Sequence, residues 1–227
     1  MRYRVLWSKR GKLRYLSHHD VATVLERSLR RAKLPLAYSK GFSAHPKIAF
    51  GSGLPVGYGS EVELLDLELE EDLDPADVRD RFDRSLPEGI GVTSIVRLEG
   101  KTTSLGSTIV AADYSIRCAA PWLRDSVTTF MSLPSYEFAR PYKGSMRTDD
   151  IRAGVLEASA EGDELLLRVR LQPHATRPSD VMKVLATLAG ETEAPPHQVR
   201  RTDLLEDVGG LLRSLVENMP QLVEATT

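Results

Sequence analysis

Cysteine is almost missing from this sequence of 227 residues, which contains Cys118 and no other. A single cysteine cannot form a disulfide within the chain, and it cannot hold an iron–sulfur cluster, which needs about three or four thiolates. Cys118 lies in a segment of alternating apolar residues, so we expect it to be a small buried residue and not a nucleophile.

Long apolar runs are also missing. No stretch reaches the roughly 18 apolar residues of a membrane-spanning helix, and the N-terminal residues MRYRVLWSKRGK lack the apolar core of a secretory signal. We therefore expect a cytoplasmic protein that has no membrane partner.

Nucleotide-binding glycine motifs are missing as well. The glycine-rich segment GSGLPVGYGS, residues 51–60, has neither the lysine of a phosphate-binding loop nor the spacing of a dinucleotide fingerprint. Its glycines are typical of turns. Together with the single cysteine, this pattern predicts that the chain binds no cofactor of its own.

Acidic residues are scarce in the first 50 residues. That segment contains 12 Lys and Arg against two Asp and Glu, whereas residues 51–227 contain 18 against 30. The net charge of −2 therefore combines a segment of +10 with a remainder of −12. This separation favours an anionic partner for the N-terminal segment. The alternative is that these cations pair with the acidic remainder inside the fold.

The first hundred residues follow the order strand, helix, strand, strand, helix, strand. Ser17, with Asp20 three residues later, predicts a capping box at the start of a helix that Pro35 ends. Asp74 and Pro75 predict the start of the second helix. The predicted strands span residues 3–8, 36–38, 61–70 and 90–98. This order is that of a ferredoxin-like, or split βαβ, unit.

The second half shows the same order with one extra hairpin strand. The predicted strands span residues 113–119, 136–140, 151–159, 164–171 and 197–203. One predicted helix spans 121–131, and the other begins at Pro178 and stops at Gly190. The expected fold class is therefore α+β, with two tandem ferredoxin-like (split βαβ) units that have antiparallel sheets. We predict a first domain at 1–100 that carries the basic region, a linker at 101–107, a second, decorated domain at 108–203 and a helical tail at 204–227.

Three of the five histidines, His18, His19 and His45, lie close to Asp20 in the sequence. Adjacent histidines point to different sides of a helix start, and no second ligand stands at the i+3 or i+4 spacing of a helical zinc site. Ser17 has a sufficient role as a helix cap, whereas the members of a catalytic triad converge from separate elements. We predict no metal site and no triad. A metal held by one histidine with Asp20 and His45 stays an alternative.

The basic segment combines cations with aromatic rings. Cations can contact phosphates, and rings offer stacking faces for unpaired bases, so single-stranded or looped RNA is the favoured partner and no DNA is expected. Core packing is the alternative for each ring. The predicted RNA-binding residues are Lys12, Arg14, Tyr15, Arg27, Arg30, Arg31, Tyr38, Lys40, Phe42, His45 and Lys47.

Two runs of sequence, KLRYLSHHD and LERSLRRAKLPLAYSKGFSAHPKIAFGSGLPVGYGSEVELLDLEL, closely resemble the radical SAM-linked protein family. This is a bacterial family of unknown function that is fused to, or encoded beside, B12-binding-type radical SAM proteins. Its pattern falls here on Ser17, His18 and Asp20, on Arg27, Arg30 and Arg31, on residues 34–42 with Gly41, and on His45 and Pro46. Position 19 is commonly apolar in the family, which argues against a role for His19.

The resemblance implies an accessory or substrate-presenting partner of a radical SAM enzyme, with RNA modification as its process and tRNA or rRNA as its substrate class. An iron–sulfur cluster and S-adenosylmethionine would then belong to the radical SAM protein, and the chain alone would not be catalytic.

A second likeness is architectural. Two ferredoxin-like units with His and Arg on the first helix are similar to the metal-independent endonucleases that process CRISPR RNA. That likeness implies acid–base catalysis by His18, Tyr38, Lys40 and His45 as an alternative. A protein-interaction module without nucleic acid is the third hypothesis.

Overall fold

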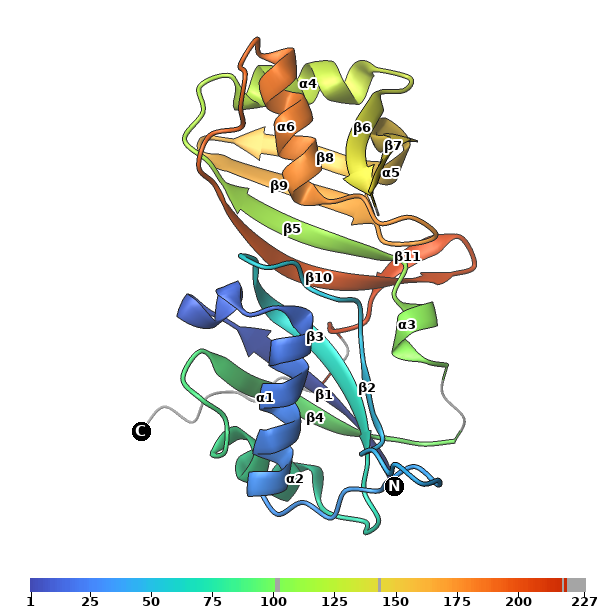
Figure 1. The fold of residues 1–227 in the computed structure, drawn as a ribbon. Coiled ribbons are helices and arrows are strands. Elements are labelled where there is room, and N and C mark those ends of the chain that lie inside the picture. Colours follow the sequence, from blue (N-terminus) through green and yellow to red (C-terminus); the bar gives the residue numbers. More distant parts are fainter. Residues whose placement is uncertain (101–102, 143, 218, 220–227) are drawn as a thin grey trace. The chain divides into compact units, whose positions relative to one another are not determined.

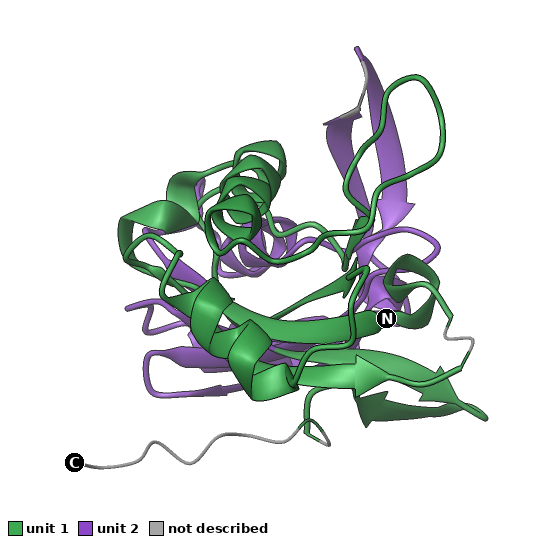
Figure 2. Cartoon of the chain, turned by 90° about the horizontal axis from the view of Figure 1, so that it is seen from below, with its two compact units in different colours: residues 1–109, 203–227 green, residues 110–202 purple. Residues whose placement is uncertain are grey.

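The computed structural model describes residues 1–100, 103–142, 144–217 and 219. The chain is mixed α+β, with mostly antiparallel strand pairing, and divides into two compact units (Figures 1 and 2). Unit 1 consists of residues 1–109 and 203–227, and unit 2 consists of residues 110–202. The residues from 203 onward therefore group with unit 1.

Unit 1 contains a sheet with the order β4-β1-β3-β2. The strands are β1 (Arg2–Lys9), β2 (Ile48–Phe50), β3 (Gly59–Glu68) and β4 (Ile90–Leu98). Its helices are α1 (His18–Arg31), α2 (Pro75–Asp83) and the short 3₁₀ helix η1 (Gly11–Tyr15). Neighbouring strands are antiparallel, and Val5 at the centre of β1 pairs with Leu65 of β3 and Ile95 of β4.

The core of unit 1 lies between α1, α2 and one face of this sheet (Figure 1). Alternate strand residues face the helices, because side chains of a strand point to opposite faces with period two. The buried apolar residues of α1 recur at the helical spacing of three to four residues. The buried residues include Tyr3, Val5 and Trp7 of β1, Leu65 and Leu67 of β3, Val21, Leu25 and Leu29 of α1, and Val78 and Phe82 of α2.

The predicted capping box at the start of α1 is confirmed. The backbone N–H of Asp20 donates to the Ser17 hydroxyl at 3.2 Å, and the Asp20 carboxylate accepts from both the hydroxyl and the backbone N–H of Ser17. These bonds lower the pKa of Asp20. At the other end, Arg81 of α2 donates to the carbonyl of Ala32 at 3.1 and 3.2 Å. Both ends of α1 therefore have partners for their terminal backbone groups.

The predicted strand at 36–38 is not formed. Leu36 and Tyr38 make only isolated bridges, to Leu69 and Pro46 respectively. The backbone of this segment instead bonds within its own loop and to the end of β3, where Ala37 donates to Glu68. The strand of unit 1 that precedes β3 is therefore β2.

Unit 2 contains a sheet with the order β10-β5-β9-β8. The strands are β5 (Ala111–Arg117), β8 (Val155–Glu161), β9 (Glu164–Arg170) and the first part of β10 (Gln198–Val208), with the helices α4 (Leu123–Ser132) and α6 (Pro178–Leu188). The predicted helix that begins at Pro178 is confirmed, and it ends at Leu188. Cys118 follows β5 and is buried as expected; burial raises the pKa of its thiol.

A two-stranded hairpin is inserted in unit 2 between α4 and β8. It consists of β6 (Glu137–Tyr142) and β7 (Ser145–Asp150), and the single-turn helix α5 (Ile151–Gly154) follows. The predicted strand at 151–159 therefore begins with a helical turn. Asp150 causes that turn by accepting hydrogen bonds from the backbone N–H groups of Arg152 and Ala153.

The expected helical tail at 204–227 is wrong for the residues that the structure describes there. β10 continues to Val208, and Gly209 and Gly210 join it to β11 (Leu211–Ser214). Both glycines have positive φ, at 64° and 87°, which is the backbone of a type I′ turn in a two-residue hairpin loop. The apolar residues that suggested a helix therefore belong to a hairpin, and residues 220–227 lie outside the described part.

Residues 101 and 102 of the predicted linker at 101–107 lie outside the described residues. Its second half begins the short helix α3 (Leu105–Thr108). Across the ranges that the structure describes, no helix has the length and apolar character that a membrane crossing requires.

Candidate nucleic-acid interface

The second half of α1 presents three arginines to solvent. One side of α1 is buried in the core through Val21, Leu25 and Leu29. The other sides are therefore exposed, and they carry Arg27, Arg30 and Arg31. Residues three and four apart are neighbours on a helix, which makes these three guanidinium groups contiguous.

Only one of these arginines pairs within the described part of the chain. Arg30 donates to Glu26 one turn earlier, at 2.8 Å. Arg27 and Arg31 have no ion pair among the described residues. Their charges therefore remain available to an external anion.

The loop after α1 is closed on itself at residues 37–47. The backbone N–H of Ser39 donates to the carbonyl of His45 at 2.9 Å, and that of Lys47 donates to Ala37 at 2.8 Å. The His45 N–H also donates to the Ser39 hydroxyl at 3.0 Å. Gly41 at the tip has a φ of 137°, a conformation that favours glycine. The loop thus has a defined base, formed by short-range hydrogen bonds, and an exposed tip.

Side chains at the tip of this loop reach into solvent. Phe42 is completely exposed, at 111% of its reference area, and Lys40 and His45 are also exposed. A large aromatic ring in water gains nothing from core packing, so the core alternative fails for Phe42. It remains a stacking face of the type that unpaired bases use.

Arg30 and Tyr38 connect the helix to the loop. The guanidinium carbon of Arg30 lies 5.8 Å from the centroid of the Tyr38 ring, and Tyr38 is itself partly exposed. Figure 1 shows the chain leaving the C-terminal end of α1 and forming this loop before β2. We call the resulting area the basic surface; its residues are Arg27, Arg30, Arg31, Tyr38, Lys40, Phe42 and His45.

The remaining predicted cations and rings lie elsewhere. Lys12, Arg14 and Tyr15 belong to η1, before the N-terminal end of α1. Arg14 donates to the Tyr15 hydroxyl at 2.6 Å and lies over the same ring at 4.8 Å. Because a helix rises 1.5 Å per residue, the two ends of α1 from His18 to Arg30 are about 18 Å apart. The predicted RNA-binding residues therefore form two clusters.

His18 belongs to the other end of α1. Its ring meets Phe50 edge-on, with 5.6 Å between centroids. Tyr38, Lys40 and His45 share the loop at the opposite end of the helix, whereas groups that transfer a proton must lie within hydrogen-bond reach of the same reacting atoms. The structure brings together three members of the proposed acid–base set and does not bring His18 to them.

Some N-terminal cations do form ion pairs with acidic residues of the remainder, which was the alternative to an external anionic partner. Lys47 bonds to Glu68 at 2.6 Å, Arg4 bonds to Asp66 at 2.8 Å, and Arg10 bonds to Glu61. Lys47 is therefore partly neutralised. The predicted lysines and arginines that are exposed and lack an ion pair within the described ranges are Lys12, Arg27, Arg31 and Lys40.

A buried polar group beneath His18 was missed by the sequence analysis. Lys9 is 1% exposed, and its ammonium donates to the carbonyl of Leu16 at 2.8 Å. Burial lowers the pKa of Lys9, and the charge of Glu63 opposes that shift. Alternation along Tyr3, Val5 and Trp7 would have indicated that position 9 faces inward.

Lys9 lines a small recess of about 10 Å³ together with Trp7, His18, Phe50 and Glu63. This volume is about that of one water probe. The indole N–H of Trp7 is buried and has no hydrogen-bond partner among the described residues. Within that part of the chain, no three His, Cys, Asp or Glu residues gather to hold a metal ion.

Comparison with protein families places this arrangement in a known group. Residues 2–182 match the family model described as an uncharacterized protein conserved in bacteria, DUF2344. The chain belongs to this family. No curated protein matches it. The family description names no activity, so function rests on the site itself.

Solved structures share only a distant likeness. One is a Cbf5-Nop10-Gar1 complex, with 15% identity, a TM-score of 0.44, and coverage of 89% of this chain and 48% of that one. The archaeal box H/ACA sRNP Nop10-Cbf5 complex gives 13% identity, a TM-score of 0.43, and coverage of 88% and 46%. This chain spans less than half the length of both. An unknown protein from Galdieria sulphuraria gives 12% identity, a TM-score of 0.28, and coverage of 91% and 98%. These values carry no argument about function.

Proposed function

We propose that this chain is an RNA-binding accessory protein that presents RNA to a radical SAM enzyme during RNA modification. The observation that carries the proposal is the basic surface. It sets Arg27 and Arg31, which have no ion pair among the described residues, beside a loop whose tip exposes Lys40 and Phe42.

The chemistry of this surface favours unpaired RNA. Guanidinium and ammonium groups contact phosphates of any sequence, and exposed rings stack on bases that are not paired. Bases inside a duplex are already stacked on one another, so loops and single strands are the RNA parts that can use Phe42 and Tyr38. Transfer and ribosomal RNA both contain such loops and are the proposed classes.

The radical SAM partner is proposed from the sequence resemblance and from one chemical fact. Cys118 is 1% exposed and is the only cysteine, so an iron–sulfur cluster and S-adenosylmethionine would be supplied by the partner. The chain would then contribute RNA binding and positioning.

We also propose that the two units are ferredoxin-like. In unit 1 the order β4-β1-β3-β2 with α1 and α2 supports this reading. In unit 2 the order β10-β5-β9-β8 with α4 and α6 supports it, and the β6-β7 hairpin is then an insertion. A solved structure of each unit compared with known ferredoxin-like folds would test this assignment.

The RNA proposal is tested with two double variants of equal charge change. Arg27→Glu/Arg31→Glu alters the basic surface, whereas Arg117→Glu/Arg124→Glu alters two exposed arginines of unit 2 that have no ion pair among the described residues. Fluorescence anisotropy with a labelled single-stranded RNA measures affinity over a series of salt concentrations. We expect the first variant to bind at least tenfold more weakly and to have a shallower salt dependence, because fewer counterions are released.

The control variant distinguishes a specific surface from overall charge. We expect Arg117→Glu/Arg124→Glu to keep the affinity and salt dependence of the wild type. Equal losses in both variants, or none in the first, would overturn the assignment of the basic surface to RNA. Crosslinking in cells followed by identification of bound RNA and protein would test the radical SAM partner separately.

A nuclease is the second candidate, because Tyr38, Lys40 and His45 share one loop. Loss of RNA cleavage in His45→Ala, with binding intact, would favour it over the accessory role. A basic surface that captures an acidic protein and no RNA in the crosslinking experiment would favour the third candidate, a protein-interaction module.

A further inference from the structure

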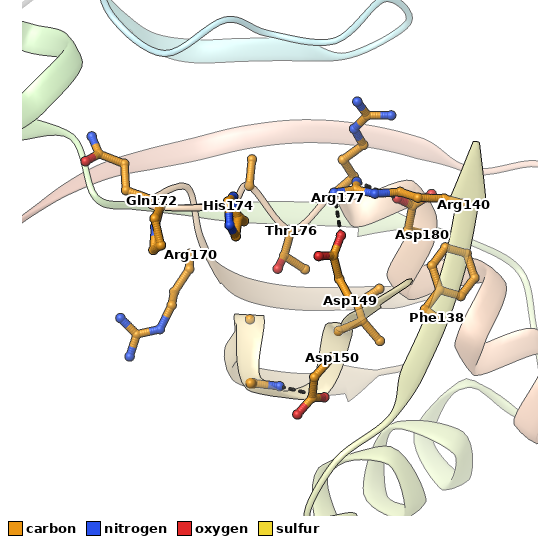
Figure 3. A pocket seen from close by; sticks show the side chains of 15 residues that line it. Phe138, Arg140, Asp149, Asp150, Arg170, Gln172, His174, Thr176, Arg177 and Asp180 are labelled. Atoms are coloured by element: carbon orange, nitrogen blue, oxygen red, sulfur yellow. Dashed lines mark hydrogen bonds and ion pairs between the residues drawn. The ribbon is translucent and has the colours of Figure 1, made fainter. Parts of the chain in front are cut away.

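Unit 2 contains a pocket that no motif in the sequence indicated. Its volume is about 290 Å³, close to the lower end of the range for small-molecule sites. The walls come from the β6-β7 hairpin, from α5, and from the connection between β9 and α6 (Figure 3). All of these residues belong to unit 2.

A network of ion pairs forms one end of the pocket. Arg140 of β6 donates to Asp149 of β7 and to Asp180 of α6, both at 3.2 Å, and Asp180 is 6% exposed. Arg147 donates to the second oxygen of Asp149 at 2.8 Å. Burial raises the pKa of Asp149, but the hydrogen bonds and charges of Arg147 and Arg140 together outweigh it, so the pKa is lowered. Both carboxylates are therefore already partnered by protein cations.

The third acidic residue of the pocket, Asp150, also has hydrogen-bond partners within the protein. The Asp150 carboxylate accepts hydrogen bonds from the backbone N–H groups of Tyr136, Arg152 and Ala153. These bonds lower its pKa. A cation would have to compete with existing partners at each carboxylate of the pocket, which argues against a cationic ligand.

Cations without partners lie elsewhere on the rim. Arg170, His174 and Arg177 are exposed, and none has an ion pair or a side-chain hydrogen bond among the described residues. In Figure 3 the guanidinium of Arg170 lies at the end of the pocket opposite Phe138, with His174 and Thr176 between them. Among the described residues, the charged lining groups with neither an ion pair nor a side-chain hydrogen bond are therefore cations; Arg170 lies away from Phe138, whereas Arg177 lies beside Arg140 on the Phe138 side.

The rest of the lining is mainly apolar. Phe138 and Ile151 contribute the larger side chains, and Ala153 and Ala175 contribute small ones. Gly154 packs so closely on Thr176 that an added Cβ would lie 1.8 Å from its hydroxyl oxygen. This contact packs α5 against the connection between β9 and α6, which carries His174 and Arg177.

From this arrangement we propose that the pocket binds a small organic anion with a flat ring, of the nucleoside monophosphate class. Arg170 and His174 donate to the phosphate, and Phe138 contacts the ring. A phosphate is favoured because a guanidinium forms charge-assisted hydrogen bonds with it. The pocket is too small for a folded RNA, so it takes either a free nucleotide or one unpaired nucleotide at the end of a strand.

The experiment measures binding by isothermal titration calorimetry with the full chain. The probes are the four nucleoside 5′-monophosphates, the corresponding nucleosides, inorganic phosphate, and a five-nucleotide RNA with or without a 5′-phosphate. We expect at least one monophosphate to bind with one-to-one stoichiometry, and its nucleoside and inorganic phosphate to bind at least tenfold more weakly. Tighter binding of the phosphorylated RNA than of every monophosphate would identify a strand end as the source.

Variants assign the binding to this pocket. Arg170→Gln removes the proposed phosphate donor and Phe138→Ala removes the ring contact, and we expect each to weaken binding about tenfold, the effect of one charge-assisted bond or one stacked ring. The matched control Arg117→Gln, an exposed arginine at the end of β5, should leave affinity unchanged.

The result is independent of the basic surface, since Arg27→Glu/Arg31→Glu should bind monophosphates as the wild type does. Circular dichroism melting verifies that Phe138→Ala is folded. Absence of saturable binding by every monophosphate and by the phosphorylated RNA, or full affinity in folded Arg170→Gln, overturns the proposal.

Discussion

The guanidinium of Arg30 lies over the ring of Tyr38, with 5.8 Å between the guanidinium carbon and the ring centroid. This contact links α1 to the loop at residues 37–47 and uses the face of the ring. The Tyr38 hydroxyl contributes nothing to it. Substitutions at Tyr38 can therefore separate the role of the ring from that of the hydroxyl.

We expect Tyr38→Phe to bind single-stranded RNA as tightly as the wild type, because the ring and its contact with Arg30 remain. Tyr38→Leu removes both and should weaken binding by about 1–3 kcal/mol, the value of one base–aromatic stack. Anisotropy titrations at constant salt measure the difference. A loss of RNA cleavage in Tyr38→Phe, with binding retained, would instead show that the hydroxyl is catalytic.

A substitution at Phe42 can test RNA binding without a change in protein stability. Its side chain is fully exposed, so Phe42→Ala should change the free energy of unfolding by no more than about 0.5 kcal/mol. RNA affinity should fall by about 1–3 kcal/mol. Met146→Ala in unit 2, where the side chain is 64% exposed, is the control and should change neither quantity. Equal RNA affinity of Phe42→Ala and wild type would remove Phe42 from the interface.

Lys9 predicts how stability changes at high pH. Its pKa is lowered by burial, so between the folded value and the unfolded value of 10.5 only the unfolded chain holds the proton. Stability should therefore rise as pH increases through this window, and the cost of the buried charge is fully present below it. Urea unfolding at several alkaline pH values measures this rise.

Substitution of Lys9 removes the titrating group. We expect Lys9→Met to have a flatter dependence of unfolding free energy on pH than the wild type over the same window. Lys12→Met, at an exposed position of η1, should keep the slope of the wild type. If Lys9→Met retained that slope, the rise would have to come from another group.

Gly154 predicts a steric effect in unit 2. Gly154→Ala places a methyl group 1.8 Å from the Thr176 hydroxyl oxygen and 2.9 Å from its Cβ, so the packing must shift. We expect a loss of about 1–3 kcal/mol in unfolding free energy, as for other overpacked sites. Adding Thr176→Ala should recover part of this loss, because the closest atom is then gone. Gly106→Ala is the control and should not destabilise the protein. A Cβ added at Gly106 would meet no atom within 4 Å, apart from its chain neighbours and the backbone of its own helix.

Local signals in the sequence were sufficient to predict where most helices begin. Ser17 with Asp20, and Asp74 with Pro75, specify α1 and α2 through caps that involve residues two or three apart. The exposure of Arg27 and Arg31 also follows from the helical period alone. The same reasoning failed after residue 204, because the apolar spacing there suits a helix as well as a strand. This segment forms a hairpin because Gly209 and Gly210 adopt positive φ and β11 pairs with β10.

The sequence by itself determined the mixed α+β composition, the cap of α1, and a basic segment with few acidic residues. Tertiary structure decided which cations of the basic segment form ion pairs with acidic residues. The pairs of Lys47 with Glu68 and of Arg4 with Asp66 join residues more than 20 positions apart. It also placed His18 at the opposite end of α1 from His45, buried Lys9, and assembled the pocket of unit 2 from three separate segments. Such contacts depend on the meeting of distant parts of the chain, which no local pattern of residues records.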